Sequence, residues 1–186
     1  MNETSNVRLA LITTLAERAP NGHIGRTALM KYLYFLQVMR GVPLEYSFSL
    51  YSYGPFDSDV LGDLSSAELL NIVNITPVEF SGGYGYQIRP GTRAESAKEK
   101  ADHFLKKYKK DIDWLFAKFG NLNSAQLELA STIIYVDREL GDRKQRSSIN
   151  TVATQVSEIK PHFSKEQVLR FTETLLKEGV LTATSR

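Results

Sequence analysis

The stretch VEFSGGYGYQI, at residues 78–88, decides how the first half of this chain is interpreted. Two runs with β-strand composition flank a Ser-Gly-Gly turn, which predicts a β-hairpin that ends at Pro90-Gly91. The segments before it predict a helix, a second helix, a short strand and a third helix. This is the element order of a winged helix. The sequence therefore predicts a mostly α fold (α+β) with a winged-helix-like N-terminal region and one β-hairpin.

The elements before the hairpin follow from apolar spacing and from breaker residues. The pattern predicts helices at about residues 9–16 and 24–39, the second ended by Arg40-Gly41. An aromatic, alternating run at residues 48–53 predicts a strand, broken by Gly54-Pro55. A third helix is predicted from Ser58, as its cap, to about Val73. Its predicted buried residues are Val60, Leu61, Leu64, Leu69 and Ile72.

After the hairpin the pattern is helical throughout. One long helix is predicted at about residues 93–119, and an Asn123–Gln126 capping box opens another that runs to about residue 140. A polar loop is expected at residues 141–148, then a helix at 150–159 and a last helix that is capped by Ser164 with Gln167 and ended by Gly179. We therefore expect a winged-helix-like region at residues 1–91 and a helical C-terminal region at residues 92–186 packed on it, either as two regions or as one compact domain.

The composition excludes several classes of protein. The 186 residues carry a net charge of +2 and no cysteine, so disulfides, thiolate nucleophiles and Cys-based metal sites are ruled out. No apolar run approaches the roughly 18 residues that span a bilayer. We expect a cytoplasmic protein without membrane contact.

The charge of residues 41–88 argues against the usual partner of a winged helix. This stretch has no lysine or arginine, although Lys and Arg contacts to phosphate supply most of the affinity of DNA-binding proteins. It does have carboxylates at Glu45, Asp57, Asp59, Asp63, Glu68 and Glu79, with tyrosines among them. An acidic, tyrosine-rich surface suits a basic protein partner. The predicted partner-binding residues are Tyr46, Tyr51, Tyr53, Gly54, Pro55, Phe56, Asp57, Asp59, Asp63, Tyr84 and Tyr86.

No motif predicts an enzyme, a metal site or a cofactor site. Residues 57–68 nearly match a calcium-binding loop, but Leu61 replaces an oxygen ligand and a strand is predicted where an entering helix is needed. The glycine-rich turn lies between strands, whereas a phosphate-binding loop precedes a helix. His23, His103 and His162 are isolated. We expect a non-enzymatic protein that needs no cofactor.

Three segments resemble a known family. They are LMKYLYF at residues 29–35, GVPL at 41–44, and Phe48 followed by YSYGPF at 51–56. They resemble the pattern of the Panacea (SocA-like) antitoxin-associated domain and, more strongly, that of YwgA-type bacterial proteins. The resemblance covers about residues 8–75. It implies a bacterial or phage origin and a protein-binding role, either neutralising a toxin or delivering a client to a protease, and it implies no catalytic residues.

The alternative is a winged-helix transcriptional regulator that binds DNA. It would have to use cations outside the acidic stretch: Arg8, Arg26, Lys31 and Arg40, the lysine run at residues 106–110, or Lys160, Lys165 and Arg170 in the last pair of helices. The lysine run spreads over much of a helix surface and has carboxylates nearby, so a solvated helix face is favoured there.

Overall fold

The computed structural model describes residues 3–80, 83–142 and 148–181, which are mostly helical with two small antiparallel sheets. The chain divides into two compact units, residues 1–49 with 56–124 and residues 50–55 with 125–186. The predicted boundary after residue 91 differs from this division. The reason is that α4 (Ala94–Lys100) packs on α1 (Glu3–Arg18) and α6 (Lys109–Phe119) packs on α2 (Arg26–Arg40), so the helices after the hairpin complete the first unit.

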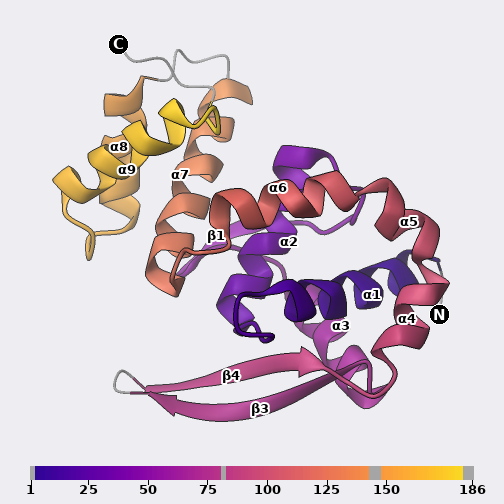
Figure 1. The fold of residues 1–186 in the computed structure, drawn as a ribbon. Coiled ribbons are helices and arrows are strands. Elements are labelled where there is room, and N and C mark those ends of the chain that lie inside the picture. The colour runs from indigo at the N-terminus through magenta and orange to yellow at the C-terminus, as the bar shows by residue number, and fades with distance from the viewer. Residues whose placement is uncertain (1–2, 81–82, 143–147, 182–186) are drawn as a thin grey trace. The chain divides into compact units, whose positions relative to one another are not determined.

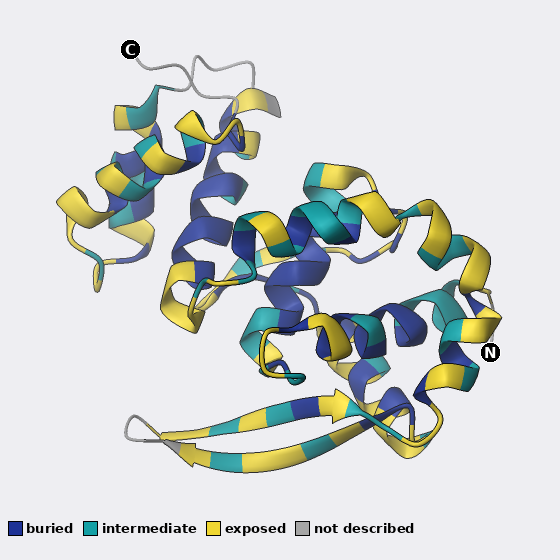
Figure 2. Cartoon of the chain, in the orientation of Figure 1, coloured by how far each residue is buried: buried dark blue, intermediate teal, exposed yellow. Residues whose placement is uncertain are grey.

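Buried side chains of α1, α2 and α6 contribute to the core of the first unit (Figure 2). Leu11 and Leu15 of α1 and Leu33 of α2 are fully buried. Phe35 stacks on Phe119 with ring centroids 4.1 Å apart, which joins α2 to the end of α6. The predicted first two helices are therefore confirmed, and their apolar stripes form the core.

The predicted β-hairpin is confirmed, with longer strands than expected (Figure 1). β3 (Val73–Phe80) pairs antiparallel with β4 (Gly83–Pro90), and the register places Val73 opposite Pro90. Ile24, in the segment between α1 and α2, forms a further antiparallel bridge to Ile88. Residues 81 and 82 of the turn lie outside the described residues. Val73 at the start of β3 and Ile88 near the end of β4 are buried at the base of the hairpin. Tyr84, near the start of β4, is 79% exposed.

The third helix differs from its prediction at both ends. α3 spans Ser58–Leu69 and its N-cap is Asp57, not Ser58. Val73 belongs to β3, because the chain turns at Asn71, which has a positive φ of 58°. Two predicted core residues are exposed: Leu61 at 37% and Leu69 at 83%. Val60, Leu64 and Ile72 are buried as expected.

The predicted long helix at residues 93–119 is wrong, because it consists of three helices. α4, α5 (Asp102–Lys107) and α6 are separated at Ala101 and Tyr108, where ψ is 18° and 13° instead of helical. The apolar spacing continues through both breaks. The first of the three helices packs on α1 and the last on α2, so tertiary packing overrides the local pattern.

The described residues of the second unit form a hairpin tip and three helices. α7 (Ser124–Asp142) is buried along most of its length, including Ala130, Ile133 and Ile134. α8 (Ile149–Ile159) and α9 (Lys165–Lys177) pack on each other. The predicted Ser164–Gln167 capping box of α9 is confirmed. Of the polar loop predicted at residues 141–148, α7 takes the first two residues, Ser148 caps α8, and residues 143–147 lie outside the described residues.

The aromatic strand predicted at residues 48–53 is in fact half of a second hairpin. β1 (Ser49–Tyr51) pairs with β2 (Gly54–Phe56), and Ser52 and Tyr53 form the turn between them. Gly54-Pro55 therefore begins the return strand and does not only end the first one. Among the described residues, no helix is both long and apolar enough to cross a membrane.

Candidate interaction site

The tip of the β1–β2 hairpin, residues 50–55, combines exposed aromatic rings with a buried base. The side chain of Tyr51 is 66% exposed and that of Tyr53 is 70% exposed. Gly54 and Pro55, which follow directly, are buried. Within the second unit Gly54 packs against α7. The hairpin tip therefore holds two tyrosine rings on a fixed backbone.

Gly54 is required at its position for two independent reasons. Its φ of 87° lies in the left-handed region that side chains disfavour. A Cβ atom added there would lie 2.8 Å from Ser131 Oγ and 3.2 Å from Thr132 Oγ1. Both hydroxyls donate to the Glu128 carbonyl, at 3.0 and 2.8 Å, and are held in place by those bonds. Only glycine lets the hairpin lie this close to α7.

A buried lysine clamps the turn of the same hairpin. Lys160 follows the last residue of α8, and only 3% of its side chain is exposed. Its ammonium group donates to the carbonyl of Ser52 and, at 3.4 Å, to that of Tyr51. A buried charge needs such partners, because removal from water is costly. Lys160 thus connects the end of α8 to the backbone beneath the two tyrosines.

The counterion of Lys160 is Glu128 of α7. Lys160 Nζ lies 2.9 Å from Glu128 Oε1, and 8% of the glutamate side chain is exposed. The Nε2 atom of His162 lies 3.4 Å from the same oxygen. Neither contact has the angles of a hydrogen bond, so the contact between Lys160 and Glu128 is an ion pair. Carboxylate, ammonium and hairpin carbonyls form one buried polar cluster.

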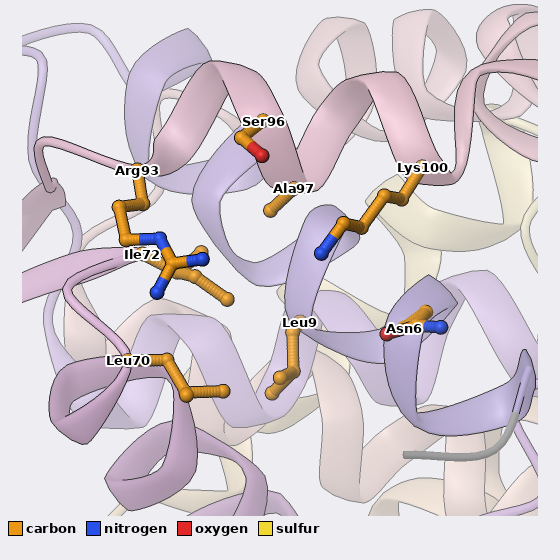
Figure 3. A pocket seen from close by; sticks show the side chains of 8 residues that line it. All are labelled: Asn6, Leu9, Leu70, Ile72, Arg93, Ser96, Ala97 and Lys100. Atoms are coloured by element: carbon orange, nitrogen blue, oxygen red, sulfur yellow. The ribbon is translucent and has the colours of Figure 1, made fainter.

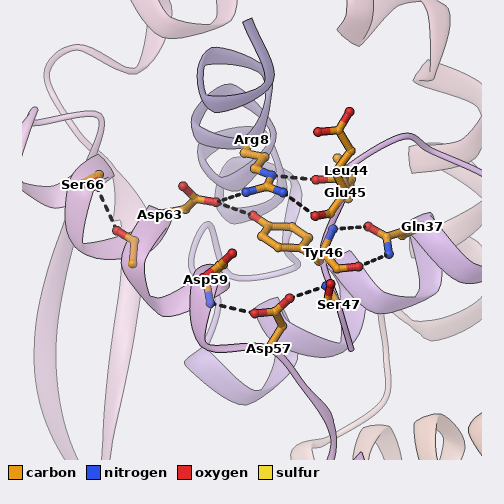
Figure 4. Close-up of polar contacts among 11 residues, drawn as sticks. Arg8, Gln37, Leu44, Glu45, Tyr46, Ser47, Asp57, Asp59, Asp63 and Ser66 are labelled. Carbon is orange, nitrogen blue, oxygen red and sulfur yellow. Dashed lines mark hydrogen bonds and ion pairs between the residues drawn. The ribbon is translucent and has the colours of Figure 1, made fainter. Parts of the chain in front are cut away.

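Several predicted contact residues instead support the first unit internally (Figure 4). Tyr46 is 5% exposed, and its hydroxyl donates to Asp63 Oδ2 at 2.8 Å. Arg8 pairs with the same oxygen at 3.4 Å, lies over the Tyr46 ring and donates to the carbonyls of Leu44 and Glu45. Burial raises the pKa of the Tyr46 hydroxyl far above its usual range, and the Asp63 carboxylate raises it further. Tyr46 and Asp63 are therefore internal supports.

Asp57 is a structural residue as well. It is 8% exposed, its Oδ1 accepts from the backbone N–H of Asp59 at 2.8 Å, and its Oδ2 accepts from the backbone N–H of Ser47. The Asp57 carboxylate thus caps α3 and also binds the backbone at Ser47, which precedes the β1–β2 hairpin, to the start of α3. Asp59 remains exposed, and Phe56 is half-buried.

The remaining predicted residues are on the β3–β4 hairpin. Tyr84 is 79% exposed, and Tyr86 is 40% exposed with the Arg26 guanidinium 3.5 Å from its ring centroid. The predicted contact residues are thus distributed over both units. Tyr51, Tyr53, Gly54 and Pro55 belong to the second unit, and the other predicted residues belong to the first.

Sequence reasoning missed the roles of Lys160 and Glu128. Lys160 was considered only as a DNA contact, yet it is buried. One signal was available: Glu128 is an acidic residue inside the apolar run that becomes the buried face of α7. A charge in such a position predicts a buried counterion. Nothing in the sequence indicates which cation that is.

Most of the cations proposed for DNA contact already have partners. Lys106 pairs with Asp102, Lys109 with Asp113, and Arg170 with Glu166. Arg40 pairs with Asp111 at 2.8 Å. These pairs agree with the interpretation of the lysine run as a solvated helix face.

Within the described part of the chain, no group of His, Cys, Asp or Glu side chains is arranged to hold a metal ion. The calcium-like segment forms the N-cap and body of α3 directly after β2. No family model matches the sequence, and the comparison with curated proteins gives no match either.

Proposed function

We propose that this protein is a non-enzymatic protein-binding module of the cytoplasm, antitoxin-like or adaptor-like, that contacts its partner through Tyr51 and Tyr53. The observation that carries the proposal is the pair of exposed rings on a base clamped by Lys160 and shaped by Gly54. Tyrosine buries much area at low cost in conformational entropy and is enriched at interface centres. A base fixed before binding reduces the entropy lost on association.

The charge of residues 41–88 supports a basic partner. Asp59, Glu68 and Glu79 are exposed on α3 and β3, and residues 41–88 contribute no cation. Such a surface favours encounter with a cationic protein and disfavours nucleic acid. A toxin that acts on nucleic acid, or a basic client of a protease, has the required charge.

The order α1, Ile24, α2, α3, β3, β4, with Ile24 bridged to Ile88, supports a winged-helix-like arrangement of the first unit. The helix that would read DNA in that arrangement is α3. It has no cation, and Asp59 and Glu68 are exposed on it. The charge of α3 and the ion pairs of the other cations favour a protein partner over duplex DNA.

A photo-crosslinking amino acid in place of Tyr53, introduced in the native host, tests the proposal. We expect a covalent adduct to a specific protein, identified by mass spectrometry. The same amino acid at the exposed Lys110 position is the matched control and should give no such adduct. Identical adducts from both positions, or none from position 53, would refute the hairpin as the contact.

A second experiment addresses the DNA alternative. Fluorescence anisotropy with duplex DNA at near-physiological salt should show only weak binding that does not depend on sequence. Tight, sequence-dependent binding that is lost on substituting Ser65 and Ser66 of α3 would overturn the protein-binding proposal in favour of a regulator.

A further inference from the structure

The first unit contains a small cleft between α1, α4 and the turn that joins α3 to β3 (Figure 3). It holds about 160 Å³. Its lining consists of Asn6, Leu9, Leu70, Ile72, Arg93, Ser96, Ala97 and Lys100. Aliphatic side chains form one part of this lining and two cations another, and the lining includes no carboxylate.

The two cations are positioned for an anion that the chain itself does not supply. Arg93 immediately precedes α4, Lys100 is its last residue, and both side chains point into the opening from opposite sides (Figure 3). Among the described residues neither side chain has an ion pair or hydrogen bond. Lys98 of the same helix contrasts with them, because it pairs with Glu17 and Glu95 at 2.7 and 2.6 Å. Two unpaired like charges beside one cleft repel each other, and a bound anion removes that cost.

The backbone around the cleft is firmly held. The Gly91 N–H donates to the Ile72 carbonyl at 2.8 Å, and the Arg93 N–H donates to the Asn71 carbonyl at 2.9 Å. Thr13 Oγ1 donates to the same Ile72 carbonyl at 3.2 Å. A Cβ atom at Gly91 would overlap the Asn71 carbonyl, so only glycine permits this close approach. Ile72 and Arg93 are therefore placed by the backbone at the base of the β3–β4 hairpin.

We propose that this cleft binds a small monocarboxylate with an apolar body about as large as benzene. The carboxylate would lie between Arg93 and Lys100, because the planar guanidinium offers two parallel N–H donors to a carboxylate. The apolar body would lie against Leu9, Ile72 and Ala97. A cavity of about 150 Å³ lined by aliphatic side chains accommodates benzene, which sets the size of the ligand. This site is independent of the protein-binding function proposed above.

Titration of the full chain with benzoate and with hexanoate, followed by methyl NMR, tests the site. We expect saturable shifts of the Leu9 and Ile72 methyl signals at millimolar acid. Benzyl alcohol and hexanol keep the apolar body and lack the charge, so they should cause much smaller shifts. Equal binding of acids and alcohols, or no saturable shift with either acid, would overturn the proposal.

Matched variants locate the charge recognition. Arg93→Gln and Lys100→Gln should each weaken benzoate binding by about fivefold or more, because each removes one charge-assisted contact. Lys98→Gln removes the same charge from the same helix but outside the cleft, and it should bind benzoate as the unaltered protein does. Ala97→Leu places a larger side chain in the lining of the cleft and should abolish benzoate binding by filling the space for the ligand. If that variant does not fold, Arg93→Gln and Lys100→Gln alone test the site. Unchanged benzoate affinity in both of them would refute the proposal.

Discussion

Lys160 Nζ and Glu128 Oε1 lie 2.9 Å apart in the interior of the second unit, and the same ammonium group holds the carbonyls beneath Tyr51 and Tyr53. One ion pair thus supports both the packing of α7 with the end of α8 and the geometry of the proposed contact hairpin.

Lys160→Met should destabilise the protein by about 3–5 kcal/mol, because it leaves the Glu128 carboxylate buried without a counterion. The double variant Lys160→Met/Glu128→Met should be less destabilised than the single one. Urea denaturation measures both, with the exposed Lys165→Met as control. A single variant as stable as that control would show that the pair contributes nothing.

Gly54→Ala should cost about 1–3 kcal/mol, since it combines a left-handed backbone with contact to Ser131 and Thr132. Gly62→Ala is the matched control, because Gly62 lies exposed in α3 with open space around its position. That change should stabilise the protein by about 0.5–1 kcal/mol through helix propensity. Thermal denaturation should therefore shift in opposite directions for the two variants, and shifts of the same sign would contradict this account.

Asp57→Ala should cost about 1–2 kcal/mol because it removes the N-cap of α3 together with the contact to the Ser47 N–H. The exposed Asp59 interacts mainly with the helix dipole, so Asp59→Ala should cost only about 0.3–1 kcal/mol. Chemical denaturation of the two variants gives the comparison. Equal losses would argue against the capping role.

Stability at alkaline pH should depend on Tyr46. The ordinary pKa of tyrosine is 10.0, and burial raises the pKa of Tyr46 well above this value and that of Tyr32 to about 12. Above pH 10 the unfolded chain loses these protons while the folded chain keeps them, so the free energy of unfolding falls as the pH rises from 10 to 12.

Tyr46→Phe should make that decrease shallower, and it should cost about 1–2 kcal/mol at neutral pH through loss of the bond to Asp63. Tyr84→Phe, at an exposed position, should leave both quantities unchanged. Denaturation curves recorded across this pH range provide the measurement. An unaltered alkaline slope in Tyr46→Phe would mean that another group controls it.

Local signals in the sequence predicted most of the elements. The Gly-rich turn between two β-type runs predicted the β3–β4 hairpin, and Ser164 with Gln167 predicted the start of α9. These features depend on residues that are neighbours in the chain. The helix end at Gly41 belongs to the same group.

The contacts of the candidate site were not predictable in this way. Lys160 binds backbone more than a hundred residues earlier in the chain, and no periodicity reports such a contact. The breaks at Ala101 and Tyr108 arise because packing partners change from α1 to α2 along an unbroken apolar pattern. Tyr46 and Asp63 were predicted at a surface because composition reports charge and aromaticity but not burial.

The contact between Lys160 and the hairpin backbone can form only late in synthesis of the chain, well after the hairpin itself has been made. Ser52 precedes Lys160 by 108 residues, so a ribosome adding about 5–20 residues per second needs on the order of 5–20 s to supply the clamp after the turn has been made. Nascent chains, and chains truncated before α8, lack the Lys160 contacts beneath the two tyrosines. Only a chain synthesised past Lys160 can hold them in the arrangement described here, so this hairpin is clamped long after its own residues have been made.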